Sequence, residues 1–326
     1  MTTSAQHRDA LRYANVPVLV LGASGFIGRW VARRLSATGA RVTCAVRDVA
    51  AMQTVCSDYD IRAEIRPIDL RDSVALHDLV AELRPSVTFN LAGYGVDRSE
   101  RDDALAWRIN ADLVGELGEL TERYVGSDWR GQCLVHTGSA LEYGTIGGHL
   151  PENAEPHPET LYGQTKLAGT RTLLAGPFRR TVTARLFTVF GAGEHAGRLL
   201  PTLLAASRHG QPVPLSAGVQ RRDFTYVEDV AEGLLRLGLL EAVPGGVVNV
   251  ATGKLYSVRE FAELAARVLH IPADRLEFGA LPQLADEMPH ETVSVERLRE
   301  SIAWVPETSI ADGVLRTAQF LGVISA

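Results

Sequence analysis

The segment VLVLGASGFIGRW, residues 18–30, joins a run of aliphatic residues to a helical pattern through a turn with three glycines. These are Gly22, Gly25 and Gly28. In a unit of this kind the first glycine permits a tight turn, the second lets a diphosphate approach the backbone, and the third lets the helix pack closely on the strand. The amides that begin the helix then face the phosphates. The place of these glycines after the first strand predicts a dinucleotide-binding turn.

Strands and helices continue to alternate after this turn. Ile27, Val31 and Leu35 recur at four-residue spacing, and Gly39 offers a left-handed residue at the helix end. Later apolar runs are RVTCAV, AEIRPI, SVTFNLA, QCLVHT and TVTARLF. Strands separated by helices pair in parallel. The pattern predicts an α/β fold with six βα units up to about residue 185, forming a doubly wound parallel Rossmann sheet.

The rest of the chain is less regular. HGQPVPLSAG is rich in turn residues, TYVEDVAEGLLRLGLL and SVREFAELAARVL are helical, and GGVVNVA predicts a short strand. We expect a smaller, irregular α/β C-terminal part that returns some elements to the sheet.

Composition and charge narrow the class of protein. The 326 residues are 46% hydrophobic and 22% charged, as in a soluble globular enzyme. The net charge of -6 gives no reason to expect nucleic acid or an anionic membrane as a partner. The three cysteines, Cys44, Cys56 and Cys133, lack metal-like spacing, so we expect core thiols, a reducing compartment and no metal site. A polar N-terminus and the lack of a membrane-length apolar stretch favour a cytoplasmic protein.

The second predicted strand ends in AVRD, where a dinucleotide-binding fold meets the adenosine ribose. An acid at this place accepts from a 2′-hydroxyl, whereas an arginine pairs with a 2′-phosphate. Both Arg47 and Asp48 are present. Because Arg47 is the first residue after the strand, the sequence favours NADP(H), with NAD(H) possible. The alternative is that Arg47 is a solvated surface charge.

A tyrosine and a lysine lie one helical turn apart in LYGQTKLAG. Tyr162 and Lys166 therefore project from the same face. A free tyrosine has a pKa of about 10, and a fixed ammonium nearby lowers it toward neutral pH. Such a pair can exchange a proton with a substrate, although by itself it also fits a surface pair.

A serine strengthens the first interpretation. Ser139 follows the strand in HTGSALEYG, about one loop before Tyr162, and its hydroxyl can bond the same substrate oxygen that Tyr162 protonates. Asn110, in RINADLVGELGEL, is expected to hold a water or a backbone bend behind Lys166, or else to be a helix-surface amide.

Eight segments occur together in order: GASGFIG, the IDL at 68–70, NLAG at 90–93, Asn110, SALEYG, YGQTK, RLFTVFG and RRDFTYVEDVA. With this set the chain resembles the extended short-chain dehydrogenase/reductase family, the NAD-dependent epimerases and dehydratases of nucleotide sugars, from about residue 17 onward. RRDFTYVEDVA followed by LEFGALPQLADEM most resembles CDP-abequose and CDP-paratose synthases, which reduce a 4-keto-6-deoxy sugar nucleotide with NADPH. The resemblance implies a Rossmann domain of residues 14–186 plus 222–253, a nucleotide-sugar-binding domain of residues 187–221 plus 254–324, and an N-terminal extension of residues 1–13.

The resemblance also implies which residues bind the cofactor and the substrate. Cofactor contacts are expected from Gly22, Ser24, Gly25, Phe26, Ile27, Gly28, Arg47, Asp69, Leu70, Leu91, Ala92, Gly93, Asn110, Tyr162, Lys166, Leu186 and Val189. Substrate contacts are expected from Ser139, Thr188 and Arg222. Arg222 falls where the family's arginine grips the substrate diphosphate, a role suited to a planar guanidinium. Arg221 competes for that role, and a surface salt bridge is the other interpretation.

Three departures from the family pattern bear on the reaction. Sugar dehydratases carry an Asp-Glu pair directly after the catalytic hydroxyl residue, where this chain has Ala140 and Leu141, so dehydration is disfavoured. Thr188 replaces a common asparagine, and Leu284 stands where relatives often have a phosphate-binding arginine.

The leading hypothesis is an NADP(H)-dependent 4-ketoreductase of a nucleotide-linked deoxyhexose, with Tyr162, Lys166 and Ser139 as catalytic residues. The alternatives are a 4-epimerase with tightly bound NAD, a carbonyl reductase of a non-sugar ketone, and a non-catalytic dinucleotide-binding protein. The resemblance further suggests a homodimer that packs through the helices of Asn110 and Tyr162.

Overall fold

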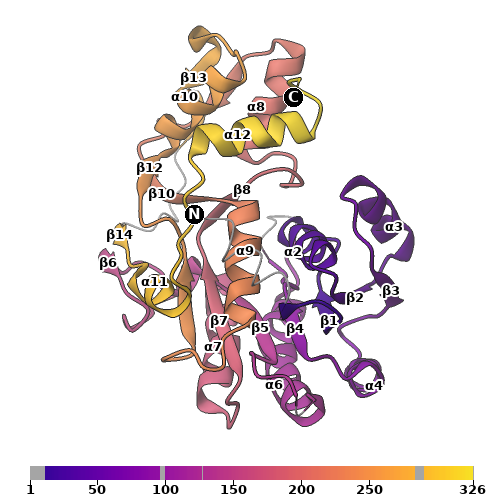
Figure 1. The fold of residues 1–326 in the computed structure, drawn as a ribbon. Coiled ribbons are helices and arrows are strands. Elements are labelled where there is room, and N and C mark those ends of the chain that lie inside the picture. The colour runs from indigo at the N-terminus through magenta and orange to yellow at the C-terminus, as the bar shows by residue number, and fades with distance from the viewer. Residues whose placement is uncertain (1–11, 96–99, 127, 283–289, 326) are drawn as a thin grey trace.

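A parallel sheet of seven strands forms the centre of the computed structural model, which describes residues 12–95, 100–126, 128–282 and 290–325 (Figure 1). Its strands lie in the order β11-β7-β5-β4-β1-β2-β3. They are β1 (Pro17–Leu21), β2 (Arg41–Val46), β3 (Glu64–Pro67), β4 (Val87–Asn90), β5 (Leu134–Ser139), β7 (Thr181–Leu186) and β11 (Val247–Val250). The six predicted strands are confirmed, in the doubly wound order, and β11 is the element that returns from the C-terminal half.

Helices cover both faces of the sheet. These are α2 (Phe26–Ala37), α3 (Val49–Asp58), α4 (Ser73–Leu83), α5 (Asp103–Trp107), α6 (Leu113–Tyr124), α7 (Leu161–Ala175) and α9 (Val227–Gly238). The side chains of β1 alternate between two cores: Leu19 and Leu21 pack with α4 and α6, while Val18 and Val20 pack with α2 and α9. This burial on both faces explains why the strands read as continuous apolar runs.

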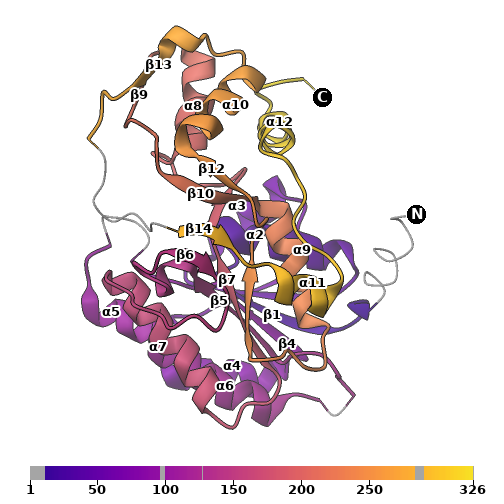
Figure 2. The ribbon, with the colours of Figure 1, turned by 90° about the vertical axis from the view of Figure 1, so that its left-hand side faces the viewer.

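The smaller C-terminal part sits beyond the point where β7 runs into β8 (Figures 1 and 2). It contains a sheet of β8 (Thr188–Phe190), β10 (Arg221–Tyr226) and β12 (Leu255–Ser257), and the pair β9 (Val213–Leu215) with β13 (Leu276–Phe278). Its helices are α8 (Leu199–His209), α10 (Val258–Val268) and α12 (Ile310–Phe320). Another pair joins β6 (Gly148–Leu150) to β14 (His290–Val293), which precedes α11 (Glu296–Ile302). Short 3₁₀ helices span Ala140–Glu142 and Ala273–Arg275.

Tyr13, the last residue of the predicted N-terminal extension, packs into the core. Residues 1–11 lie outside the described residues, but Tyr13 is fully buried and its hydroxyl donates to the Leu235 carbonyl at 2.8 Å. Its ring packs beside Phe89 and Trp129. Tyr13 therefore belongs to the core, because it fills the space between the sheet and α9.

Cys44 and Cys133 are buried, as predicted, and burial raises their pKa values to about 12 and about 11. No helix within the described residues is long and apolar enough to cross a membrane. In the same part of the chain, no three His, Cys, Asp or Glu side chains gather as a metal site would require.

Candidate active site

The glycine-rich turn lies between β1 and α2. Gly22 has a φ of +74°, and a Cβ there would come within 2.7 Å of the Leu91 carbonyl carbon. A Cβ on Gly28 would overlap the Gly22 carbonyl oxygen. The side chain of Arg29 holds the turn from the other side by donating to the carbonyls of Ser24 and Gly25. Gly22 and Gly28 thus admit no side chain, as a tight turn and close packing of the helix on the strand require.

Next to this turn lies the part of the predicted cofactor site that would meet the adenosine ribose. It carries charges of both signs. Arg47 directly follows β2, as predicted, and its side chain is exposed. The carboxylate of Asp48 instead caps α3, accepting from the Ala51 amide at 2.9 Å. Hydrogen bonds from Arg71 lower the pKa of Asp69 to about 2, and the charge of Arg47 adds to the effect. Arg47 therefore lies near Asp69, whereas the Asp48 carboxylate is bonded to the first turn of α3.

The loop after β4 lies between the glycine turn and α7. Ala92 offers its carbonyl to Lys166 Nζ at 3.5 Å, and a Cβ on Gly93 would lie 3.5 Å from the same nitrogen. Asn110 is fully buried in a π-helical turn, Arg108–Asp112. Its amide accepts from the Tyr94 backbone N–H and donates to the Tyr94 carbonyl and to Thr165. The predicted backbone-holding role fits this geometry, whereas a helix-surface amide is excluded.

Ser139 and Tyr162 meet at the carboxyl end of β5. Ser139 is the last residue of the strand, and its side chain lies near enough to Tyr162 to lower the pKa of the phenol. Tyr162 begins α7 just after its cap, Thr160, and is partly exposed beside Gly95. Lys166 follows one turn later, buried, with Nζ 6.0 Å from the centre of the Tyr162 ring. The three side chains singled out from sequence thus lie together.

The pKa of Tyr162 is shifted in the direction opposite to the predicted one. Burial raises the pKa of Tyr162, and the carboxylates of Glu142 and Glu100 raise it further, against the opposing effects of Arg198 and Ser139. Burial also lowers the pKa of Lys166 to about 8, while Glu142 acts in the opposite direction. Loss of hydration and two carboxylates therefore raise the pKa of Tyr162 in this arrangement, where the sequence predicts that Lys166 lowers it.

Sequence reasoning missed the charged residues Glu142, Arg185, Glu194 and Arg198, of which Glu142 and Arg198 act on the pKa of Tyr162. Glu142 and Arg185 form a buried ion pair at 2.8 Å, and opposite charges inside otherwise apolar runs were the available signal. Burial raises the pKa of Glu194 to about 7, against the charge of Arg198. These two residues lie in GAGEHAGR, which reads only as a turn.

The remaining predicted residues lie where the sheet meets the C-terminal part. Leu186 ends β7, Thr188 and Val189 belong to β8, and Arg222 lies in β10, which pairs with β8. Arg221 directs its guanidinium to the Leu255 carbonyl at 2.9 Å. Leu284 and most of PQLADEM lie outside the described residues.

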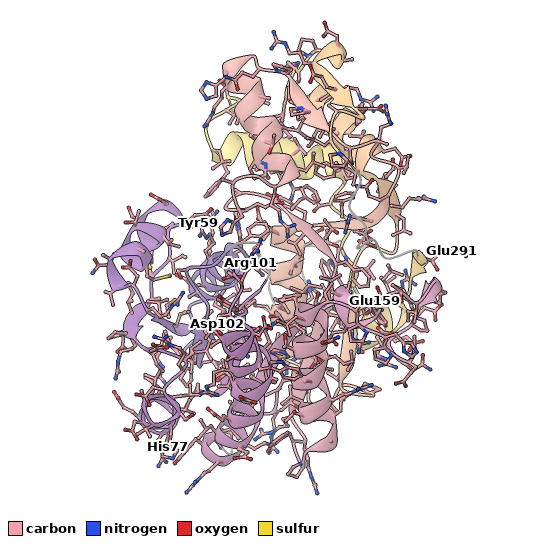
Figure 3. The ribbon with its side chains drawn as sticks, turned by 180° about the vertical axis from the view of Figure 1, so that it is seen from behind. Tyr59, His77, Arg101, Asp102, Glu159 and Glu291 are labelled. Carbon is pink, nitrogen blue, oxygen red and sulfur yellow. The ribbon has the colours of Figure 1, made fainter. Side chains whose placement is uncertain are left out.

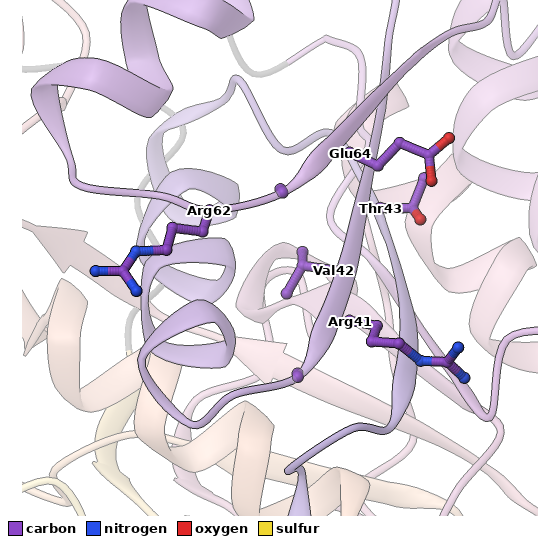
Figure 4. Close-up of a pocket in the computed structure, with 7 residues that line it drawn as sticks. Arg41, Val42, Thr43, Arg62 and Glu64 are labelled. Carbon is purple, nitrogen blue, oxygen red and sulfur yellow. The ribbon is translucent and has the colours of Figure 1, made fainter.

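Two surface hollows lie at the amino ends of the strands, away from the predicted site residues. One, of about 320 Å³, lies over the starts of β2 and β3, where the side chains of Arg41 and Arg62 point away from each other (Figure 4). The other lies beside Pro17, Arg84 and Tyr124. In Figure 3, Tyr59 and Arg101 lie midway along the molecule, below the C-terminal part, whereas His77 lies near the bottom. The predicted residues instead gather at the carboxyl edge of the sheet, where ligands of this fold bind.

The chain resembles known proteins along most of its length. A family model described as "NAD dependent epimerase/dehydratase family" matches residues 18–251. The dTDP-6-deoxy-L-talose 4-dehydrogenase (NAD(P)(+)) of Kitasatospora kifunensis is 30% identical over 318 residues, 93% of this chain and 95% of that protein. The UDP-glucose 4-epimerase of Mycolicibacterium smegmatis is 28% identical over 93% of this chain and 97% of that protein. The CDP-abequose synthase of Salmonella muenchen is 23% identical over 92% and 96%.

A solved structure shows the same likeness. MoeE5 in complex with UDP-glucuronic acid and NAD is 26% identical, with a TM-score of 0.76 over 94% of this chain and 98% of that one.

Proposed function

Because the chain belongs to the NAD dependent epimerase/dehydratase family, whose members act on nucleotide sugars, we propose that it reduces a nucleotide-linked 4-keto-6-deoxyhexose with NADPH. The observation that carries the proposal is the meeting of Ser139, Tyr162 and Lys166 beside the glycine turn and the β4 loop. When bound, the nicotinamide supplies the hydride for the ketone carbon.

In this proposal the protein handles the oxygen of the ketone. Tyr162 donates its phenolic proton to that oxygen, and the Ser139 hydroxyl bonds it while negative charge develops. A phenol is protonated at neutral pH, which is the state a proton donor needs, and the surroundings of Tyr162 raise its pKa further. Lys166, held by the carbonyls of Thr137 and Ala92, provides the nearby positive charge and orients α7 against the loop.

The residues after Ser139 support reduction over dehydration. Loss of water from a sugar needs an acid and a base beside the ring, and Ala140 and Leu141 provide neither. Glu142 comes next, but its carboxylate is fully buried and bonded to Arg185 and to the Ser139 amide. A carboxylate held in this way is a poor proton shuttle.

The choice of NADPH rests on the end of β2. Arg47 is exposed and available to a 2′-phosphate, whereas Asp48, the residue that would select NAD through its ribose hydroxyls, caps α3. For the substrate diphosphate we propose Arg222, in β10, which pairs with β8. Thr188 lies nearby on β8.

A 4-epimerase is the second candidate, favoured by the similarity to a UDP-glucose 4-epimerase. The same three side chains serve both reactions, so cofactor behaviour separates them. An epimerase retains NAD and needs no added reductant.

The test uses the purified protein with CDP-, UDP-, GDP- and dTDP-linked 4-keto-6-deoxyhexoses. The proposal expects NADPH oxidation with at least one of them and a product reduced at C4. Conversion of an NDP-hexose without reductant, by protein that carries NAD, would replace it with the epimerase.

A further inference from the structure

Arg29 lies in α2, the helix that begins at the glycine turn, and its side chain folds back onto that turn. Its Nη2 donates to the Ser24 carbonyl at 2.6 Å, and its Nε donates to the Gly25 carbonyl at 3.1 Å. A guanidinium can bond two acceptors at once because its donors lie in one rigid plane. One side chain therefore holds two consecutive peptide groups of the turn.

The carbonyls that Arg29 bonds belong to the peptide groups at the start of α2. The Gly25 carbonyl also accepts the first hydrogen bond of the helix, from the Arg29 backbone amide at 3.2 Å. The amides of Phe26, Ile27 and Gly28 come before that bond and have no acceptor within the helix. In a trans peptide the N–H points away from the carbonyl, so fixing the Gly25 carbonyl also fixes the Phe26 amide. Amides at the start of a helix are the groups that bind phosphate in a turn of this kind.

The guanidinium of Arg29 is itself held in place by residues far along the chain. It lies 5.1 Å from the centre of the Tyr59 ring, and its Nη1 donates to the Tyr59 hydroxyl at 3.4 Å. Gly193, in the loop after β8, lies against the same groups: a Cβ there would come within 2.7 Å of the hydroxyl and 3.0 Å of Nη1. The position of the Arg29 side chain is therefore set by the end of α3 and by the loop after β8.

Aromatic packing fixes the surroundings of Tyr59 in turn. The rings of Tyr59 and Trp30 are buried, and their centres lie 5.0 and 5.2 Å from that of Phe320 in α12. Trp30 Nε1 also donates to the Ala192 carbonyl at 2.8 Å. The place of the guanidinium is thus built by the fold itself. Groups that are fixed in advance lose less conformational freedom when a ligand binds.

The charge of Arg29 is unfavourably placed for the helix alone. A helix carries partial positive charge at its N-terminus, so a cation near that end destabilises it. The first turn of α2 contains no acidic residue, and the side chain of Arg29 bonds two carbonyls and a hydroxyl, none of which neutralises its charge. A bound diphosphate supplies the negative charge that this end of the helix favours.

We propose that Arg29 is a positioning residue for the dinucleotide: its guanidinium fixes the Ser24 and Gly25 carbonyls and thereby orients the amides that begin α2 for the diphosphate. This inference rests on the proposed function only for the presence of a dinucleotide, and not for the substrate or the reaction. Because both cofactors contain the same diphosphate, Arg29 serves NADPH and NADH alike, unlike Arg47.

The test replaces Arg29 and compares ligands with and without a diphosphate. Arg29→Met keeps an unbranched side chain beside Tyr59 and removes the donors and the charge. Titration calorimetry should show a loss of affinity of about 10-fold or more for NADPH, NADH and ADP-ribose, the size expected for charge-assisted hydrogen bonds. Adenosine lacks the diphosphate, so its affinity, followed by NMR titration, should stay close to that of wild type. A general weakening of the fold would not spare adenosine in this way.

Arg33→Met is the matched control, because Arg33 lies one turn later on the same helix and stacks on Trp30 and Phe320. It should leave the affinity for all four ligands unchanged. Arg29→Lys keeps the charge but cannot bond two carbonyls as a planar fork, so it should recover only part of the affinity. It also serves as the second variant if circular dichroism shows that Arg29→Met folds poorly. Unchanged affinity in folded Arg29→Met, an equal loss in Arg33→Met, or full affinity in Arg29→Lys would overturn the proposal.

The binding measurements separate this proposal from the proposed function. A wild type that binds NADPH but reduces no nucleotide sugar would defeat the proposed function, while the titrations would still decide the role of Arg29. A wild type that binds no dinucleotide would overturn both.

Discussion

Lys166 Nζ lies 6.0 Å from the centre of the Tyr162 ring and directs its hydrogen bonds to the carbonyls of Thr137 and Ala92 instead of to the phenol. The ammonium thus ties α7 to the ends of β4 and β5. Ser139 is the hydroxyl residue that lies near Tyr162. In the proposed reaction, this arrangement leaves the phenol to the ketone oxygen.

Tyr162→Phe should lower the rate of ketone reduction by about 100-fold or more, because the proton donor is lost while the ring is kept. The melting temperature and the affinity for NADPH should change little. Steady-state kinetics against a Tyr124→Phe control, which alters a phenol bonded to His77 at the far end of the molecule, checks this. Turnover within a few-fold of wild type would remove the donor role.

Lys166→Met should abolish activity yet stabilise the protein at neutral pH. The pKa of Lys166 falls from 10.5 to about 8 in the folded state, so the unfolded chain binds more protons between these values. The free energy of unfolding should therefore rise with pH between about 8 and 10.5. Below this range, the cost of burying the charged lysine is fully present.

Urea unfolding of Lys166→Met and wild type at neutral and alkaline pH measures this difference, which should shrink as the pH rises. Lys254→Met, in the turn before β12, is the matched control and should leave the pH dependence of unfolding unaltered. A wild type more stable than Lys166→Met at neutral pH would contradict the expected sign.

Arg47→Ala should weaken NADPH binding by about 10- to 100-fold, the range for a lost charge-assisted hydrogen bond, with little effect on NADH. Titration calorimetry with both cofactors measures it. Arg41→Ala removes an exposed arginine at the start of the same strand, where it bonds the Asn15 carbonyl, and should leave both affinities intact. Equal losses for the two cofactors would place Arg47 outside the site.

Gly28→Ala should abolish dinucleotide binding and destabilise the fold, because the added methyl group would overlap the Gly22 carbonyl. Gly126→Ala is a suitable control, since a Cβ there meets no atom within 4 Å. Thermal shift with and without NADPH compares the two variants. A Gly28→Ala protein that still gains stability from NADPH would argue against the predicted turn.

The predicted homodimer packs through the helices that carry Asn110 and Tyr162. Trp107, at the end of α5 and directly before the turn of Asn110, is 43% exposed. Trp107→Asp should therefore shift a dimer toward monomer in sedimentation velocity, with secondary structure retained. A wild type that sediments as a monomer at micromolar concentration would defeat the prediction.

The amino-acid sequence determined the central sheet and much of the candidate site. Strand and helix periodicity is local, and parallel pairing brings the carboxyl ends of β1, β4 and β5 to one edge. Gly22, Ser139 and Tyr162 therefore had to lie near one another once the strand order was known. The short distance in sequence between Tyr162 and Lys166 fixed their common face.

Tertiary structure decided what depends on partners distant in the chain. Glu142 meets Arg185, Tyr13 meets Leu235, and Asn110 meets Thr165, and none of these pairs leaves a periodic signal. The protonation of Tyr162 belongs to the same class, because a pKa depends on how much water is excluded and on which charges surround the group. The sequence could place the phenol, but only the packed structure brought Glu100, Glu142 and Arg198 around it and so reversed the expected direction of its pKa shift.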